Sequence, residues 1–193
     1  MTSLLQTLAP GFLVAAPSLR DPNFDHSVVL MCVHNDDGAM GLVINRPAPV
    51  TMGDILSQMQ IEHARDGKVD LEQAAMVGGP VALDSGLLLY QVPPGTASRE
   101  DELTVADELR LCPNQQLLRE IGLGQAPGPY HIFLGHAGWG PGQLESEISQ
   151  GAWIPASLVL SLVFETPVDE RWEAALANEG LSPAQVGTFR PSN

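Results

Sequence analysis

The chain has 193 residues, a length that fits one domain spanning residues 1–193 with a core that needs no disulfides. Its 9 basic and 23 acidic residues give a formal net charge of −14, and the basic residues are scattered, which disfavours direct binding to nucleic acid. No apolar run approaches the ~18 residues of a membrane span, and the N-terminal stretch lacks the basic region of a signal peptide.

The two cysteines, Cys32 and Cys112, form no CxxC pair. Two isolated thiols are typical of a reducing compartment, so we expect a cytoplasmic protein without membrane association. Cys32 lies inside an apolar run, and we expect it to be a small buried side chain.

In the first half of the chain, short apolar runs between turn residues predict strands at 11–17, 27–33, 40–45, 74–77 and 86–92. An Asn-Asp-Asp-Gly turn at 35–38 joins the second and third of these runs as a hairpin. Between the third and fourth, Thr51 as N-cap with Asp54 at the third helical position predicts a helix. The polar stretch 63–70 and the Gly-rich residues 78–80 are predicted turns or loops.

In the second half, strands are predicted at 103–107, 130–135 and 156–164, after a loop at 93–101. Proline in a first helical turn marks three helix starts, at Pro113, Pro141 and Pro167. The last of these helices is expected to be capped by Thr166 and to end at Gly180, and a capping box at 182–185 opens a short final helix.

Strands and helices intermix without the regular alternation of a doubly wound sheet. The sequence therefore predicts an α/β protein: a single compact domain with a mixed β-sheet flanked by α-helices.

Common catalytic signatures do not occur in the sequence. It contains no GxSxG elbow, no GxxxxGK[ST] phosphate loop, no GxGxxG after a strand and no HExxH pair. The run His34-Asn35-Asp36-Asp37 has ligands for a hard cation, but Asn and Asp after a strand favour a turn. We predict no metal and no cofactor, and the sequence identifies no catalytic residue.

The stretch 135–153, GHAGWGPGQLESEISQGAW, is the richest in candidate residues. Glycines between a strand and a helix allow close approach of a ligand, and a helix N-terminus presents free N–H groups to an anion. Glu145 and Glu147, two residues apart, cannot share a helix face as a catalytic pair, whereas Gln143 and Glu147 can. Trp139 and Trp153 are expected to pack in or beside the core. Packing is the favoured explanation of this stretch, and a ligand or partner surface stays open.

Two further segments follow strand ends, where open sheets place ligands. Arg46, next to Asn45, either grips a carboxylate or phosphate or pairs with a surface acid. Gly78-Gly79-Pro80 is either a backbone nest for an anion or a tight turn.

These residues together resemble the YqgE/AlgH family of bacterial proteins. The matching stretches are 21–47, 77–81, 135–153 and 164–176, in the family's order. The shared motif residues are Asp21, Phe24, Ser27, His34, Gly41, Asn45, Arg46, Pro47, Gly78, Gly79, Pro80, Gly138, Trp139, Gly142, Gln143, Leu144, Glu147 and Trp153. His136 and Tyr90 depart from the family, whose members commonly have tyrosine and histidine at those respective positions, so neither is a good candidate for an obligatory general base.

The resemblance implies a compact α/β domain with a mixed sheet, and no established catalytic residues. The family's best-known member was named as a regulator of alginate synthesis, and members are often labelled transcriptional regulators. This favours a non-enzymatic protein that binds a small anionic ligand or a protein partner and affects gene expression indirectly. An enzyme of unrecognised mechanism acting on a small anionic substrate is the alternative, and a direct DNA-binding regulator is disfavoured by the charge. The predicted binding residues are Asn45, Arg46, Gly78, Gly79, Pro80, Gly138, Trp139, Gly142, Gln143 and Glu147.

Overall fold

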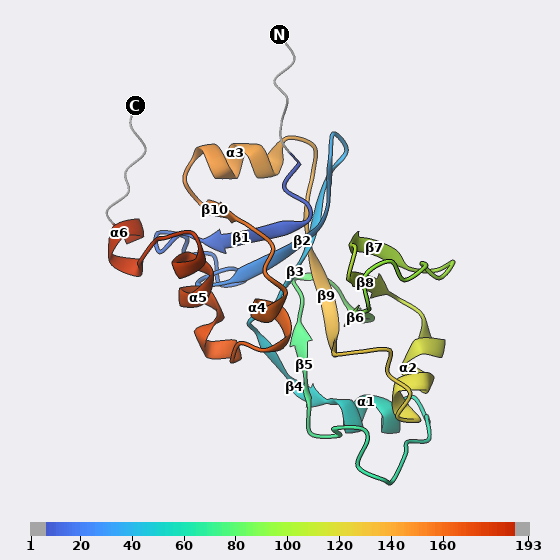
Figure 1. The fold of residues 1–193 in the computed structure, drawn as a ribbon. Helices are drawn as coiled ribbons and strands as arrows, with labels where there is room; N and C mark the ends of the chain where they lie inside the picture. The colour runs from blue at the N-terminus through green and yellow to red at the C-terminus, as the bar shows by residue number, and fades with distance from the viewer. Residues whose placement is uncertain (1–6, 188–193) are drawn as a thin grey trace.

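A computed structural model describes residues 7–187, so the two ends of the expected domain, 1–6 and 188–193, lie outside the described residues. Most of the strands belong to one continuous sheet (Figure 1). The strands are β1 (Gly11–Ala15), β2 (Val28–Asn35), β3 (Gly38–Val43), β4 (Pro47–Thr51), β5 (Ala74–Val77), β6 (Val81–Gln91), β7 (Leu103–Ala106), β8 (Leu109–Cys112), β9 (Tyr130–Trp139) and β10 (Trp153–Ala156).

Strand β9 joins the two halves of the sheet. The strand order is β10-β1-β2-β3-β9-β6-β8-β7, and β5 pairs with β9 from off this path and with β4. One end of β9 pairs with β3, whereas the rest of the strand pairs with β6. The β5–β9 pair is parallel and the other described pairs are antiparallel, which confirms the predicted mixed sheet.

Some of the helices cover both faces of the β1–β3 half of the sheet, and others pack against its other half (Figure 1). The helices are α1 (Met52–Gln58), α2 (Gln115–Gly122), α3 (Gln143–Ser149), α4 (Leu160–Phe164), the 3₁₀ helix η1 (Val168–Glu170), α5 (Arg171–Asn178) and α6 (Pro183–Gly187). Side chains alternate between faces along a strand. Phe12 and Val14 of β1 therefore pack in the core under α4 and α5, and Leu13 and Ala15 pack in the core under α3. This double burial explains the uninterrupted apolar runs of β1 and β2.

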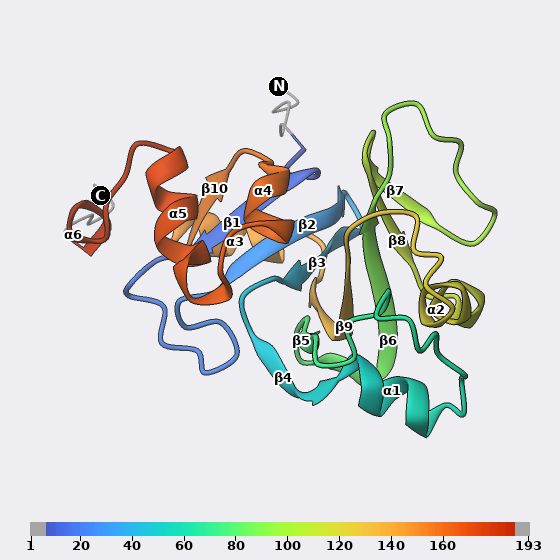
Figure 2. The same ribbon diagram turned by 60° about the horizontal axis from the view of Figure 1, so that its bottom comes forward.

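A third core lies in the other half of the sheet, where α1 and α2 pack against β6 and β9 (Figure 2). The predicted N-cap Thr51 starts α1 and forms a capping box with Asp54. Asp54 N donates to Thr51 Oγ1 at 3.2 Å, and Thr51 N donates to an Asp54 carboxylate oxygen at 2.9 Å. Cys32 is buried as expected, and burial raises its thiol pKa to about 12. Among residues 7–187, no helix is long and apolar enough to cross a membrane.

Several predictions of element bounds are wrong. Strand β6 begins at Val81 rather than at residue 86, and strands β4 and β8 were not predicted. Pro113 and Pro141 precede the N-caps Asn114 and Gly142 rather than lying in the first helical turn.

The strand expected at 156–164 is instead the end of β10 followed by α4, because tertiary packing overrides the β-propensity of this apolar run. Thr166 does not cap a helix: its hydroxyl donates to the Ser161 carbonyl at 3.0 Å, and α5 begins after η1. Strand β9 continues four residues beyond the predicted end at Gly135, so His136 to Trp139 lie in the sheet.

Candidate functional site

The predicted pair Asn45 and Arg46 lies just after β3 and holds the loop of residues 17–27 in place. Asn45 Nδ2 donates to the His26 carbonyl at 2.8 Å, and its Oδ1 accepts from Val28 N at 2.9 Å. Arg46 Nη1 donates to the Pro22 carbonyl at 2.8 Å and Nη2 to the Asp25 carbonyl at 3.1 Å. Both side chains therefore already bind backbone groups of this loop.

An open cleft of about 570 Å³ lies beside this pair, which we name the Arg46 cleft. Its lining comes from the loop, from the end of β3, and from η1, α5 and α6: Pro17, Asp25, His26, Asn45, Arg46, Val168, Asp169, Trp172, Glu173 and Pro183. The lining includes three exposed acidic residues, Asp25, Asp169 and Glu173, and one arginine, Arg46. The cleft therefore has an excess of negative charge.

His26 is the strained residue of the Arg46 cleft. Its φ of 53° lies in the left-handed region that side chains other than glycine adopt at a cost. Its ring packs on Trp172, with ring centroids 4.6 Å apart, and Nδ1 lies 2.7 Å from Asp25 Oδ1. The Trp172 indole itself is fixed by a 2.9 Å bond from Nε1 to the Ala15 carbonyl. These contacts hold the imidazole at the cleft wall.

Gly78 and Gly79 are buried between β9 and β3, away from solvent. Gly78 N donates to the Leu134 carbonyl at 2.9 Å, and the Gly78 carbonyl accepts from Val43 N at 2.8 Å. Gly79 has φ +153°, and a Cβ there would lie 2.2 Å from the His136 carbonyl carbon. The two glycines allow backbones to touch where β5 leads into β6, while Pro80 follows on the surface.

The predicted stretch around α3 forms a closed hydrogen-bond network. Glu147 Oε2 accepts from both indole nitrogens, Trp139 Nε1 at 2.9 Å and Trp153 Nε1 at 2.8 Å, and its Oε1 accepts from Gln143 Nε2 at 2.9 Å. Gln143 Oε1 in turn accepts from Gly140 N at 3.0 Å. One N–H group at the start of this helix, that of Gln143, donates to the Gly140 carbonyl at 3.1 Å. Both tryptophans are buried, as predicted.

Phe24 joins the tryptophan network to the loop that Arg46 holds. Its ring lies 6.1 Å from Trp139 and 5.4 Å from Trp153, between centroids. Gly138 and Gly142 have open space where a Cβ would be added. The ten predicted binding residues thus form three groups, of which Asn45 and Arg46 alone line the Arg46 cleft.

Both ring nitrogens of His34, a candidate cation ligand in the sequence, have hydrogen-bond partners. Its Nδ1 accepts from Leu8 N at 3.1 Å, and Nε2 lies 2.8 Å from Glu145 Oε1. The Leu8 bond requires an unprotonated Nδ1, so the Nε2 proton is donated to Glu145. His34 therefore fastens the chain before β1 to α3.

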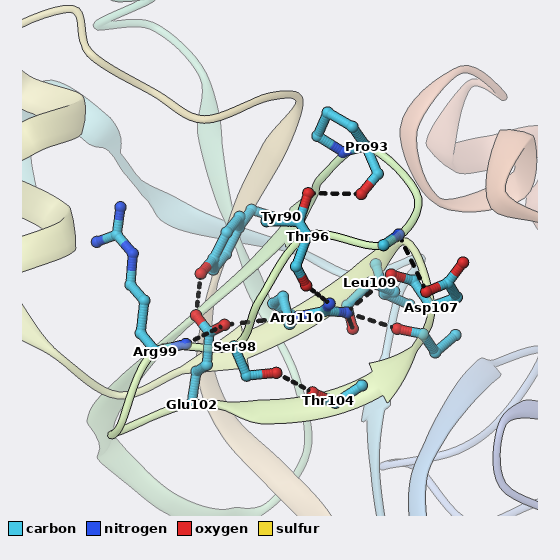
Figure 3. Close-up of polar contacts among 12 residues, drawn as sticks. Tyr90, Pro93, Thr96, Ser98, Arg99, Glu102, Thr104, Asp107, Leu109 and Arg110 are labelled. Carbon is cyan, nitrogen blue, oxygen red and sulfur yellow. Dashed lines mark hydrogen bonds and ion pairs between the residues drawn. The ribbon is translucent and has the colours of Figure 1, made fainter.

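A second polar cluster, which the sequence did not predict, surrounds Glu102 (Figure 3). The Tyr90 hydroxyl donates to Glu102, Arg99 N donates to its Oε1 at 2.8 Å, and Arg110 Nε lies 3.5 Å from the same oxygen. The Glu102 side chain is 1% exposed, so this carboxylate is closed to a substrate. Burial and the bond to Glu102 raise the pKa of Tyr90. The cluster fastens the loop before β7 to β6 and β8.

Buried Arg171, at the start of α5, was also missed. Its Nη1 donates to the Ile44 carbonyl and Nε donates to the Thr166 carbonyl at 3.0 Å. Burial lowers its pKa to about 10, which leaves it charged at neutral pH. Arginine is mostly exposed in proteins, so pattern reading gives no signal for such a residue.

His131 of β9 lies near Arg171 and is held neutral. Burial, and to a lesser extent the charge of Arg171, lowers its pKa to about 4. The hydrogen bond from Nε2 to the Val163 carbonyl, at 2.9 Å, acts in the opposite direction and is outweighed. Its ring stacks on Phe164 with centroids 5.6 Å apart. The unfolded state therefore takes up a proton on this ring at a higher pH than the folded state does. The contribution of the neutral ring to the free energy of unfolding is complete above pH 6.5 and is lost as the pH falls toward 4.

We therefore predict that His131→Gln removes part of the acid sensitivity of the fold. At neutral pH, His131 adds up to about 3 kcal/mol to the free energy of unfolding compared with acidic pH. This value follows from the difference between its pKa of about 4 in the folded state and about 6.5 in the unfolded state. Urea unfolding of both proteins from pH 7.5 to 5 measures it. The stability curves should converge as pH falls, because carboxylate titration cancels in the difference; parallel curves would contradict the assignment.

The AlgH-like family model matches residues 12–184 of the chain. The chain belongs to the AlgH-like family. A UPF0301 protein of Anaeromyxobacter dehalogenans strain 2CP-C is 42% identical over 179 residues, which cover 92% of this chain and 90% of the relative. These findings confirm the family resemblance inferred from the motifs.

Two solved structures share the AlgH-like fold. The solution structure of the AlgH protein from Pseudomonas aeruginosa matches with a TM-score of 0.77 and 33% identity over 100% of both chains. The crystal structure of protein DIP2367 from Corynebacterium diphtheriae matches with a TM-score of 0.74 and 26% identity, covering 94% of this chain and 92% of that one. They confirm the predicted α/β class.

Proposed function

We propose that this protein acts by binding a basic segment of a protein partner in the Arg46 cleft, without catalysis, and that any effect on gene expression passes through that partner. The observation that supports this most is the lining of the cleft. Asp25, Asp169 and Glu173 are exposed there, and the guanidinium of Arg46 donates to two carbonyl groups of the chain itself.

Of the two kinds of partner predicted from the sequence, this lining favours the protein over the small anion. A cleft lined mainly by one sign of charge focuses its field and attracts the opposite sign. The net charge of −14 adds to the same field over longer distances at low salt. Lysine or arginine side chains of a partner fit these carboxylates better than a phosphate does.

The other candidate side chains already have hydrogen-bond partners within the chain, which supports binding over catalysis. Glu147 accepts three hydrogen bonds, both ring nitrogens of His34 have partners, and His131 is neutral and bonded to a backbone carbonyl. A general base needs a free lone pair within reach of the substrate proton.

The double change Asp169→Asn with Glu173→Gln tests the proposal. The probe is a fluorescein-labelled twelve-residue peptide of alternating lysine and glycine, titrated at low salt. We expect the dissociation constant to rise about tenfold, since each exposed charge pair contributes up to ~1 kcal/mol. The control Asp36→Asn with Asp37→Asn, in the turn at the opposite end of β3, makes the same change in charge. Equal weakening by both variants would contradict a binding site in the cleft.

One observation favours an enzyme as the second candidate. The Asp25 carboxylate lies 2.7 Å from His26 Nδ1, which leaves Nε2 as an acceptor in the cleft that Arg46 lines. His26→Gln separates the two functions in the same experiment. A binding protein keeps its affinity for the peptide, whereas a hydrolase loses turnover of a small anionic ester.

A further inference from the structure

The carbonyl of Ile44 leaves the hydrogen-bond ladder where β2 and β3 end. In an antiparallel ladder, the two residues of a hydrogen-bonded pair exchange one bond in each direction. In the register of these strands Val28 lies opposite Ile44, and Ile44 N donates to the Val28 carbonyl at 2.9 Å. The return bond is not made, because Val28 N donates instead to Oδ1 of Asn45 at 2.9 Å. The Ile44 carbonyl therefore accepts from a donor outside the sheet.

That donor is Arg171, at the start of α5. Its Nη1 donates to the Ile44 carbonyl, and its Nε donates to the Thr166 carbonyl at 3.0 Å. The side chain is 3% exposed, and it forms no ion pair with a carboxylate of residues 7–187. Burying a cation without a counter-ion costs free energy. What this side chain provides is therefore the geometry of its hydrogen bonds rather than an ion pair.

The two carbonyls lie at the starts of the segments that form the two walls of the Arg46 cleft. Ile44 lies two residues before Arg46, which holds the loop that carries Asp25. Thr166 lies three residues before Asp169 of the opposite wall. A basic segment that contacts carboxylates on both walls depends on the distance between them.

We propose that Arg171 is a positioning residue of the Arg46 cleft: by holding the Ile44 carbonyl out of the ladder, it fixes the distance between the two walls. Asn45 belongs to the same arrangement, because its Oδ1 replaces the acceptor that Val28 N–H loses. The proposal rests on the cleft as the site that binds a basic segment. A site whose groups are already held in place loses less free energy in ordering them when the partner binds.

The charge and the position of Arg171 predict opposite effects on binding. Its guanidinium lies against the backbone that precedes Asn45 in the cleft lining, and a cation there repels a basic peptide. Removal of the charge alone therefore strengthens binding, whereas loss of the positioning bond weakens it. The sign of the change separates the two roles.

The variant Arg171→Gln tests the proposal. The amide nitrogen of glutamine takes the place of Nε and can donate to the Thr166 carbonyl, but it ends two atoms short of Nη1 and does not reach Ile44. NMR couplings across hydrogen bonds, measured on labelled protein without peptide, identify the acceptor of Val28 N–H. In wild type we expect a coupling to the side-chain carbonyl carbon of Asn45. In the variant this coupling should disappear, because Val28 then pairs with the Ile44 carbonyl.

Affinity for the lysine–glycine peptide gives the second measurement. We expect its dissociation constant to rise about fivefold in Arg171→Gln, which corresponds to the ordering of about one side chain. Arg171→Lys keeps a cationic donor one atom longer than glutamine, so it should restore both the Asn45 coupling and the affinity. The control Arg119→Gln removes the same charge from an exposed position on α2 and should not weaken binding.

A wild-type protein in which Val28 N–H couples to the Ile44 carbonyl overturns the proposal, and this result stands even if the glutamine variant does not fold. An Asn45 coupling that persists in Arg171→Gln also overturns it, as does a peptide that binds this variant as tightly as wild type or more tightly. If the peptide does not bind wild type at all, the proposed function fails alone. The couplings, which are measured without peptide, then still decide the role of Arg171.

Discussion

Replacing Gly79 with alanine should prevent stable folding. The new Cβ would lie 2.2 Å from the carbonyl carbon of His136 and 2.4 Å from the nitrogen of Ala137, and those atoms belong to the backbone of the central strand β9. The φ of +153° adds conformational strain for any residue with a Cβ. We expect a loss of about 4 kcal/mol or more, a large part of the stability of a domain this size.

Gly138→Ala provides the control within the same predicted binding set. A Cβ at Gly138 meets no atom within 4 Å, so this variant should unfold within about 0.5 kcal/mol of wild type. Urea unfolding followed by circular dichroism measures both. If Gly79→Ala folds normally, the close approach of the two backbones at β9 is not required for folding. A ligand contact would then be the better explanation of Gly79.

This contrast shows what a glycine motif predicts and what it does not. The sequence indicated that the backbone is closely approached at Gly78, Gly79, Gly138 and Gly142. Glycine permits such an approach by a ligand and by a neighbouring strand alike, so the motif does not distinguish the two. Which of them is present depends on where β9 lies relative to β5, a contact between segments more than 50 residues apart. Local pattern reading has no access to such long-range pairing.

Local rules predicted local features well. The hairpin at 35–38, the N-cap Thr51 and the Gln143–Glu147 contact depend on residues a few positions apart, and all three are present. The run at 156–164 was mistaken for a strand because buried helices and buried strands share an apolar composition. The Glu102 cluster was missed because its members lie up to 20 residues apart and each is a common surface type or a strand residue.

The packing of the 135–153 stretch depends on the carboxylate of Glu147. Glu147 lies half-buried on α3, and its carboxylate joins the end of β9 through Trp139 to the start of β10 through Trp153. The centroids of the indole rings lie 5.9 Å apart with an interplanar angle of 79°, and both rings contact Phe24. One side chain therefore orients the aromatic residues that hold α3, two strands and the loop of residues 17–27.

Glu147→Leu should lower the free energy of unfolding by about 3–5 kcal/mol. It leaves two buried indole N–H donors without an acceptor, at about 1–3 kcal/mol each, and frees Gln143 from its partner. Glu147→Gln keeps one carbonyl oxygen for the indoles and should cost about 1 kcal/mol. Denaturant unfolding gives the free energies, and the tryptophan emission of the folded variants reports the indole surroundings. A glutamate without this structural role would tolerate both replacements without loss of stability, so equal stability of all three proteins would contradict the role assigned to Glu147.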